Sequence, residues 1–133
     1  MREPKLKLTR NRRIESEIVV DAYTPEERTM GWHCYLDDRL AFPFKARCIT
    51  EHSISPLTKG EVVEVLSMAS ERDCRVEMFV RIRWQARKLG VPLAQLKPLR
   101  VGAPKTKELA QQQRLRLQAV TDWHYWLAMG YAF

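Results

Sequence analysis

The fold of this chain is decided by residues 60–100, whose sequence is GEVVEVLSMASERDCRVEMFVRIRWQARKLGVPLAQLKPLR. Apolar side chains occupy every second position of residues 78–84 (MFVRIRW), and this period of two predicts a strand with one buried face. Residues 61–66 (EVVEVL) are rich in β-branched side chains and predict a second strand. Residues 88–92 (KLGVP) predict a return strand after a short turn at 85–87.

The elements on either side of these strands suggest a barrel. Residues 93–96 (LAQL) predict a single helical turn, residues 97–100 a last short strand, and residues 45–50 an earlier one. Several short strands joined by close hairpins, with one helical turn before the last strand, are typical of a small SH3-like β-barrel. We therefore predict such a barrel over about residues 45–100. This analogy of pattern concerns the fold and not the function.

A helix is predicted before the barrel, because residues 24–27 (TPEE) form a capping box. The Thr24 hydroxyl can accept a hydrogen bond from the Glu27 amide, and Glu27 can bond back to the cap. Pro25 suits the first helical position, where a missing N–H costs nothing. Pro43 ends the helix. The expected core face repeats every fourth residue and comprises Trp32, Leu36 and Leu40.

A second helix is predicted after the barrel, over residues 107–129, which are rich in good helix formers. A break near Thr121-Asp122, with these residues capping a second piece, is left open. The fold class is therefore α+β, a small SH3-like barrel flanked by an N-terminal and a C-terminal helix. Residues 1–13 are expected to be a flexible basic arm and residues 14–133 a single domain.

The 133 residues carry a net charge of +7, and this charge is unevenly distributed. Residues 1–13 hold six basic and one acidic side chain (+5), and residues 14–80 hold seven and thirteen (−6). Residues 81–133 hold ten basic and two acidic side chains (+8). An acidic middle between two basic ends suggests a charged partner.

The motifs that carry enzymatic chemistry are missing from the sequence. It contains no GxSxG, no P-loop and no GxGxxG, so we expect a binding protein and not an enzyme. Three widely spaced cysteines without zinc-site spacing suggest reduced thiols. The basic N-terminus lacks the apolar stretch of a signal peptide, and no apolar run is long enough to cross a bilayer, so we expect a cytoplasmic protein.

Long blocks of the sequence resemble a known family. They are DAYTPEERTMGWHCYLDDRLAFPFKARC, ISPLTKGEVVEVLSMASERDC, EMFVRIRW, VPLAQL and DWHYWLAMGYAF. With these blocks in this order, the chain resembles the small cyanobacterial calcium-binding proteins (CcbP-like) and their bacterial relatives over about residues 14–133. The resemblance implies an SH3-like barrel with flanking helices. It also implies calcium binding through acidic surface side chains, in a small regulator or buffer.

Two acidic pairs are candidate calcium ligands. Asp37 and Asp38 stand where the resemblance places the family's acidic pair. They lie near the end of the predicted helix, where a cation would relieve their unfavourable interaction with the helix dipole. Glu71 and Asp73 lie on a polar turn with exposed carbonyls. Calcium takes about six to eight oxygen ligands, mostly carboxylates and carbonyls. Each pair can also be explained as a solvated surface, and no EF-hand spacing occurs.

A second hypothesis uses the basic residues. A basic SH3-like module could bind nucleic acid, an acidic protein or a larger complex, with its metal site weakened or lost. A solvated basic surface is the simpler explanation of the same residues. The candidate side chains are Arg2, Lys5, Lys7, Arg10, Arg12, Arg13, Arg81, Arg83, Arg87 and Lys88.

Overall fold

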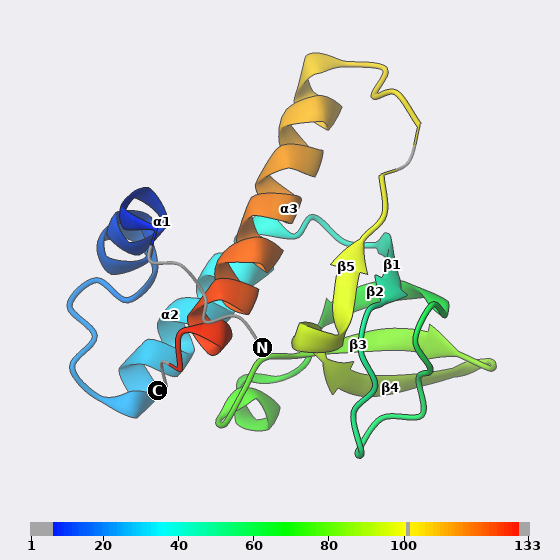
Figure 1. The fold of residues 1–133 in the computed structure, drawn as a ribbon, viewed down its shortest axis with the longest axis horizontal. Helices are drawn as coiled ribbons and strands as arrows, with labels where there is room; N and C mark the ends of the chain where they lie inside the picture. Colours follow the sequence, from blue (N-terminus) through cyan, green and yellow to red (C-terminus); the bar gives the residue numbers. More distant parts are fainter. Residues whose placement is uncertain (1–6, 101, 131–133) are drawn as a thin grey trace.

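The structure consists of three α-helices beside a five-stranded antiparallel sheet, and the computed structural model describes residues 7–100 and 102–130 (Figure 1). The helices are α1 (Leu8–Arg13), α2 (Pro25–Arg39) and α3 (Lys107–Ala128). The strands are β1 (Phe44–Cys48), β2 (Val62–Met68), β3 (Phe79–Trp84), β4 (Arg87–Pro92) and β5 (Leu96–Pro98). Three short turns complete the set: the π-helical turn η1 (Ile14–Ile18) and the 3-10 turns η2 (Glu71–Cys74) and η3 (Leu93–Gln95).

The sheet has the strand order β4-β3-β2-β1-β5. The predicted succession of short strands, with a helical turn before the last one, is confirmed. The predicted SH3-like barrel is not confirmed as a closed structure: β4 and β5 form opposite edges, and no pairing in the described ranges joins them. Gln85 and Ala86 both have positive φ and form the two-residue turn of the β3–β4 hairpin. Ala46, Val65 and Ile82 are fully buried on the inner face.

The beginning of α2 confirms the predicted capping box. The Thr24 side chain accepts a hydrogen bond from the Glu27 amide at 3.1 Å, and its hydroxyl donates to the Glu27 carboxylate at 3.1 Å. The predicted core face is also confirmed, because its three side chains have no exposed surface. These are Trp32, Leu36 and Leu40.

The end of α2 is held by a buried arginine from α3. The Arg116 guanidinium donates hydrogen bonds of 2.6 Å to the carbonyls of Leu40 and Ala41. It also lies over the Phe44 ring, with its central carbon 4.6 Å from the ring centroid. Burial lowers the pKa of Arg116, and the two carbonyls accept hydrogen bonds from its Nε and from one terminal nitrogen. One side chain therefore ties α2, β1 and α3 together.

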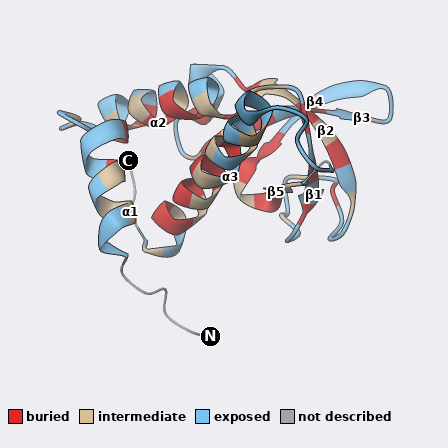
Figure 2. Ribbon diagram, turned by 90° about the horizontal axis from the view of Figure 1, so that it is seen from above, coloured by how far each residue is buried: buried red, intermediate tan, exposed pale blue. Residues whose placement is uncertain are grey.

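An aromatic cluster joins α2 to α3. Trp32 packs against Trp123 with ring centroids 5.0 Å apart, and against Trp126 at 5.5 Å. Figure 2 shows buried residues concentrated where α2, α3 and the sheet meet. The open question of a break near Thr121-Asp122 is settled, because α3 runs through this region without interruption. No helix in the described part of the chain is both long and apolar enough to cross a membrane.

The N-terminal segment differs from its prediction. Residues 8–13 form α1 instead of a flexible arm, and residues 1–6 lie outside the described residues. The chain continues into η1, where Ile14 and Ile18 are buried against the core. Burial of these two side chains explains why the segment is ordered, since each removes a large apolar surface from water.

A glycine allows η1 to approach α2 closely. An added Cβ at Gly31 would lie 2.2 Å from the carbonyl oxygen of Ile18, which is far inside van der Waals contact. Residue 31 must therefore lack a side chain for η1 to pack in this position.

The substitution Gly31→Ala is expected to lower the free energy of unfolding by about 1–3 kcal/mol, because the methyl group displaces the η1 backbone. The control is Gly90→Ala in β4, where the nearest atom, the Val80 carbonyl oxygen, is 4.0 Å from the new Cβ. Urea unfolding measures both. Equal stability of the two variants would show that the contact with η1 is not tight in solution.

Candidate metal centre

The acidic turn η2 places two carboxylates on the surface. Glu71 and Asp73 are both exposed. The Ser70 hydroxyl donates to an Asp73 carboxylate oxygen at 3.0 Å, and the Asp73 amide donates to the Ser70 side chain at 3.4 Å. This reciprocal cap fixes the direction of the turn.

Two inward side chains hold η2 against the rest of the molecule. The His33 ring on α2 lies with Nε2 2.8 Å from the Ala69 carbonyl, so this nitrogen is the donor. Cys74 is buried beneath the turn, and its sulfur accepts from the Phe79 amide at 3.3 Å. Burial raises the pKa of the Cys74 thiol, which therefore stays protonated and acts as a packing residue.

Two open hollows meet at Glu71. One, of about 620 Å³, lies between η2 and the first turns of α2 and contains Glu26, Thr29 and Glu71. The other, of about 760 Å³, is lined by His33, Ser70, Glu71, Arg72 and Asp73. The capping box had explained Glu26 as a helix-start residue. The packing of η2 on α2 places this carboxylate in the same hollow as Glu71.

The other acidic pair lies elsewhere on α2. Asp37 and Asp38 are in its last turns and are exposed. The Asp38 carboxylate is 3.5 Å from the Arg39 guanidinium and is 80% exposed. The structure does not join this pair to Glu71 and Asp73. Within the described ranges, no three histidine, cysteine, aspartate or glutamate side chains are grouped closely enough to hold a metal.

The chemistry available at η2 is that of a weak oxygen site for a hard cation. Carboxylates, the Ser70 hydroxyl and exposed carbonyls are the oxygen ligands that calcium prefers. Two or three protein carboxylates leave most of about six to eight coordination positions to water or backbone. Arg72 and Arg75 also line the first hollow, and their positive charges compete with a cation.

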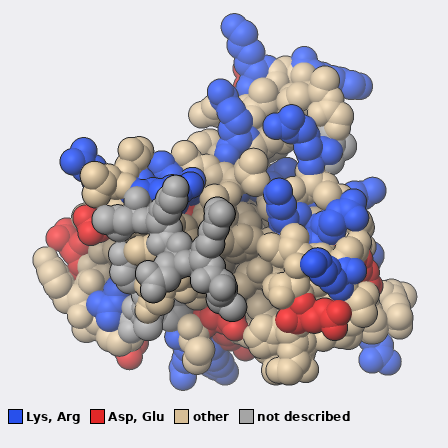
Figure 3. All heavy atoms as spheres, viewed as in Figure 1, with Lys and Arg blue, Asp and Glu red and all other residues tan. Residues whose placement is uncertain are grey.

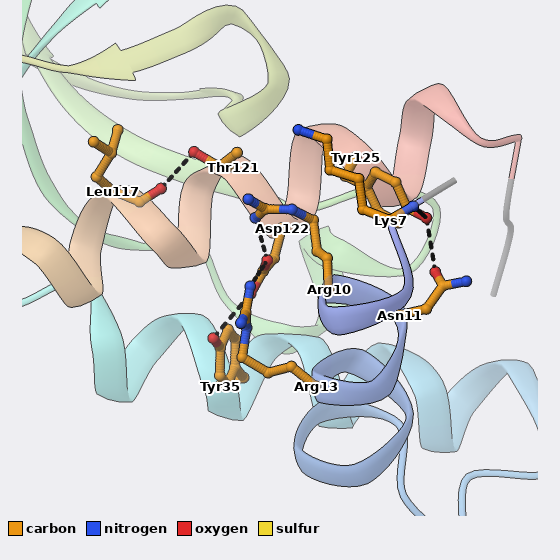
Figure 4. Close-up of polar contacts among 9 residues, drawn as sticks. All are labelled: Lys7, Arg10, Asn11, Arg13, Tyr35, Leu117, Thr121, Asp122 and Tyr125. Atoms are coloured by element: carbon orange, nitrogen blue, oxygen red, sulfur yellow. Dashed lines mark hydrogen bonds and ion pairs between the residues drawn. The ribbon is translucent and has the colours of Figure 1, made fainter. Parts of the chain in front are cut away.

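Two basic residues predicted to face a partner point inward instead. Arg10 and Arg13 of α1 bind the Asp122 carboxylate, which is fully buried on α3 (Figure 4). The Arg13 bonds are 2.7 and 2.9 Å long. The bond to Asp122 raises the pKa of Arg13. These two arginines are used in docking α1 and are not available to a phosphate backbone.

Tyr35 of α2 completes the cluster. Its hydroxyl donates to Asp122 at 3.1 Å. Burial, together with the negative charge of Asp122, raises the pKa of Tyr35 to about 12. A second contact holds the start of α1, where the Tyr125 hydroxyl donates to Asn11 at 2.9 Å and accepts from the Lys7 amide at 3.2 Å. Asp122 therefore joins all three helices.

The remaining predicted basic residues have different positions. Arg81 and Arg83 are exposed on β3, and Arg83 pairs with Glu64 at 3.4 Å. Arg87 and Lys88 are exposed on β4. Lys7 and Arg12 are exposed on or beside α1, whereas Arg2 and Lys5 lie outside the described residues.

A family model and two solved structures match this chain over most or all of its length. A family model described as calcium binding, Calci_bind_CcbP, matches residues 12–127. The chain belongs to the CcbP family of calcium-binding proteins. The crystal structure of Anabaena CcbP is similar, with 34% identity, a TM-score of 0.77 and complete coverage of both chains. A calcium-binding protein in its calcium-binding form matches with 34% identity, a TM-score of 0.75 and complete coverage of both chains. No curated protein matches.

Membership of this family confirms the resemblance read from the sequence blocks. The family match does not distinguish between the two acidic pairs. The hollow beside Glu71 and the buried cluster at Asp122 are features that the residue patterns alone did not indicate.

Replacing Asp122 by Asn is expected to lower the free energy of unfolding by about 3 kcal/mol, because Arg10 and Arg13 keep their charges but lose their partner. Urea unfolding measures the loss. The control Asp38→Asn removes an exposed carboxylate beside Arg39 and should change stability by less than about 0.5 kcal/mol. Equal effects of the two substitutions would exclude a structural role for the buried cluster.

Stability should also fall in alkaline solution because of Tyr35. Its folded pKa of about 12 lies above the ordinary value of about 10, so the unfolded state loses its proton first as pH rises. The stabilisation is complete below pH 10 and is lost between about pH 10 and 12, by less than about 1.4 kcal/mol per pH unit. Urea unfolding of the wild-type and Tyr35→Phe proteins across this pH range should show that the difference between their free energies of unfolding shrinks as pH rises. A difference that stays constant with pH would contradict the raised pKa of Tyr35.

Proposed function

We propose that this protein binds Ca²⁺ at η2, through the carboxylates of Glu71 and Asp73. Glu26 on α2 lines the same hollow as Glu71 and adds negative charge to the surroundings of a bound ion. The observation that carries the proposal is the complete-length similarity to a calcium-binding protein in its calcium-binding form. The acidic, serine-capped turn is the part of this chain whose oxygen atoms suit that ion.

Two features favour η2 over the Asp37–Asp38 pair. The turn is held by His33 and Cys74, so its carboxylates start from a defined geometry. A preorganised site loses less conformational entropy when it binds a ligand. Asp38 already has a neighbouring cation in Arg39. Asp37 and Asp38 stay a second candidate, to be separated from η2 by mutation.

The proposed role is that of a small, non-enzymatic calcium regulator or buffer. Few carboxylates and several nearby basic side chains favour weak binding, with a dissociation constant of about 10⁻⁴ to 10⁻³ M. Because the ligands are exposed to solvent, a bound calcium ion should exchange rapidly with free calcium. A regulator would change the packing of η2 on α2 when calcium binds, whereas a buffer would not.

Calorimetric titration with CaCl₂ at low ionic strength tests the proposal. The wild-type protein should give saturable heat, and Glu71→Gln/Asp73→Asn should weaken binding about tenfold or more, because two charged ligands are lost. The matched double variant Asp37→Asn/Asp38→Asn changes the net charge by the same amount and should retain most of the affinity.

A reversed result, with binding lost only in the Asp37 and Asp38 variant, would move the site to the end of α2. Absence of heat from the wild-type protein at millimolar calcium would reject calcium binding for this chain.

A further inference from the structure

Sheet topology gathers basic side chains that are far apart in the sequence. Lys45 and Arg47 lie on the exposed face of β1, whose side chains alternate between buried and exposed. Lys97 of β5 is also exposed and stands directly opposite Arg47 in the antiparallel pairing. The sequence had singled out none of these three residues, because β1 and β5 are separated by about a third of the chain.

This arrangement is electrostatically unfavourable in the protein alone. Like charges directly opposite each other on neighbouring strands destabilise a sheet. None of the ion pairs in residues 7–100 and 102–130 contains Lys45, Arg47 or Lys97. Arg47 donates only a long hydrogen bond of 3.3 Å to the Gly60 carbonyl. Glu64 faces Lys45 but is paired with Arg83.

The positive charge continues from β5 towards α3. A hollow of about 630 Å³ lies between residues 98–100 and 102–104 on one side and the N-terminal half of α3 on the other. Arg100, Lys107 and Arg114 line it, and its described lining contains no acidic residue. Figure 3 shows blue side chains dominating the part of this face that holds α3 and the segment before it. The hollow thus adds three basic side chains in the region that follows β5.

We propose that this basic surface binds the phosphate backbone of duplex nucleic acid. The basic surface is defined by Lys45, Arg47, Lys97, Arg100, Lys107 and Arg114. A duplex carries one negative charge per roughly 1.7 Å of its axis, so a row of fixed cations releases many condensed counterions on binding. Side chains on one face of a sheet repeat every 6–7 Å or so along a strand and about 4.8 Å across strands, which suits contact with several phosphates.

The composition of the surface selects this partner over two others. Single-stranded nucleic acid is held mainly by bases stacked on aromatic rings, and none of the residues lining the hollow is aromatic. An acidic protein would need a buried apolar or aromatic anchor at the centre of its interface. Leu117, at 41% exposure, is the one large apolar side chain in the described lining. The proposed calcium ligands share no residue with this surface.

Fluorescence anisotropy with a labelled DNA duplex of about 20 base pairs tests the proposal between about 50 and 200 mM salt. The test variant is Lys97→Gln/Arg100→Gln/Arg114→Gln. The matched control, Arg12→Gln/Arg75→Gln/Arg87→Gln, also removes three positive charges, but from exposed positions outside the basic surface. Each lost phosphate contact should reduce the logarithmic salt slope by about 0.9, so the test variant should lose about 2.7 and the control almost nothing.

Further probes distinguish the partners. The same strand without its complement and a poly-glutamate chain should both bind more weakly than the duplex. Circular dichroism and calcium titration should be unchanged in the test variant, because all three side chains are exposed and none of them lines the hollows at η2. No duplex binding at about 50 mM salt, equal losses in both variants, or tighter binding of poly-glutamate would each overturn the proposal.

Discussion

The charge of Asp122 cannot be buried alone, and this constraint organises the helical part of the molecule. Burial of an isolated carboxylate inside a protein costs several kcal/mol of desolvation free energy. Here Arg10, Arg13 and Tyr35 surround it, so the N-terminal helix becomes part of the folded unit. The basic residues that looked suited to an external partner are partly used to neutralise an internal charge.

Arg116 of α3 connects the helices to the sheet. It satisfies carbonyls that α2 leaves free at its end and packs over Phe44 of β1. Together with the Trp32–Trp123 contact, it fixes α2 in relation to the sheet. The acidic turn η2 then rests on a supported surface through His33. A stable scaffold of this kind lets a short surface turn present oxygen ligands in one geometry.

Part of the positive charge of this chain lies away from the acidic turn η2. Lys45, Arg47 and Lys97 are exposed on β1 and β5, and Arg100, Lys107 and Arg114 line a hollow that contains none of the η2 residues. This distribution lessens the conflict between a calcium-binding family and a chain of net charge +7. Positive charge far from a cation site weakens calcium binding less than positive charge beside it, because water and salt screen the longer distance. Arg72 and Arg75 line the hollow beside Glu71, and Arg81 and Lys88 line a hollow that contains Asp73, so these basic residues are near enough to matter.

Local signals determined the secondary structure. The capping box at Thr24, the alternation in β3 and the apolar stripe through Trp32 and Leu36 each describe neighbouring residues, and the structure confirms them. Both acidic pairs were also visible in the sequence. The sequence did not show that Glu26 lines the same hollow as Glu71, that Lys97 stands opposite Arg47, or that Asp122 is buried. These facts depend on how distant elements dock. Backbone hydrogen bonding and side-chain periodicity act over a few residues, whereas the partners of a buried charge are chosen by tertiary packing across more than 100 positions.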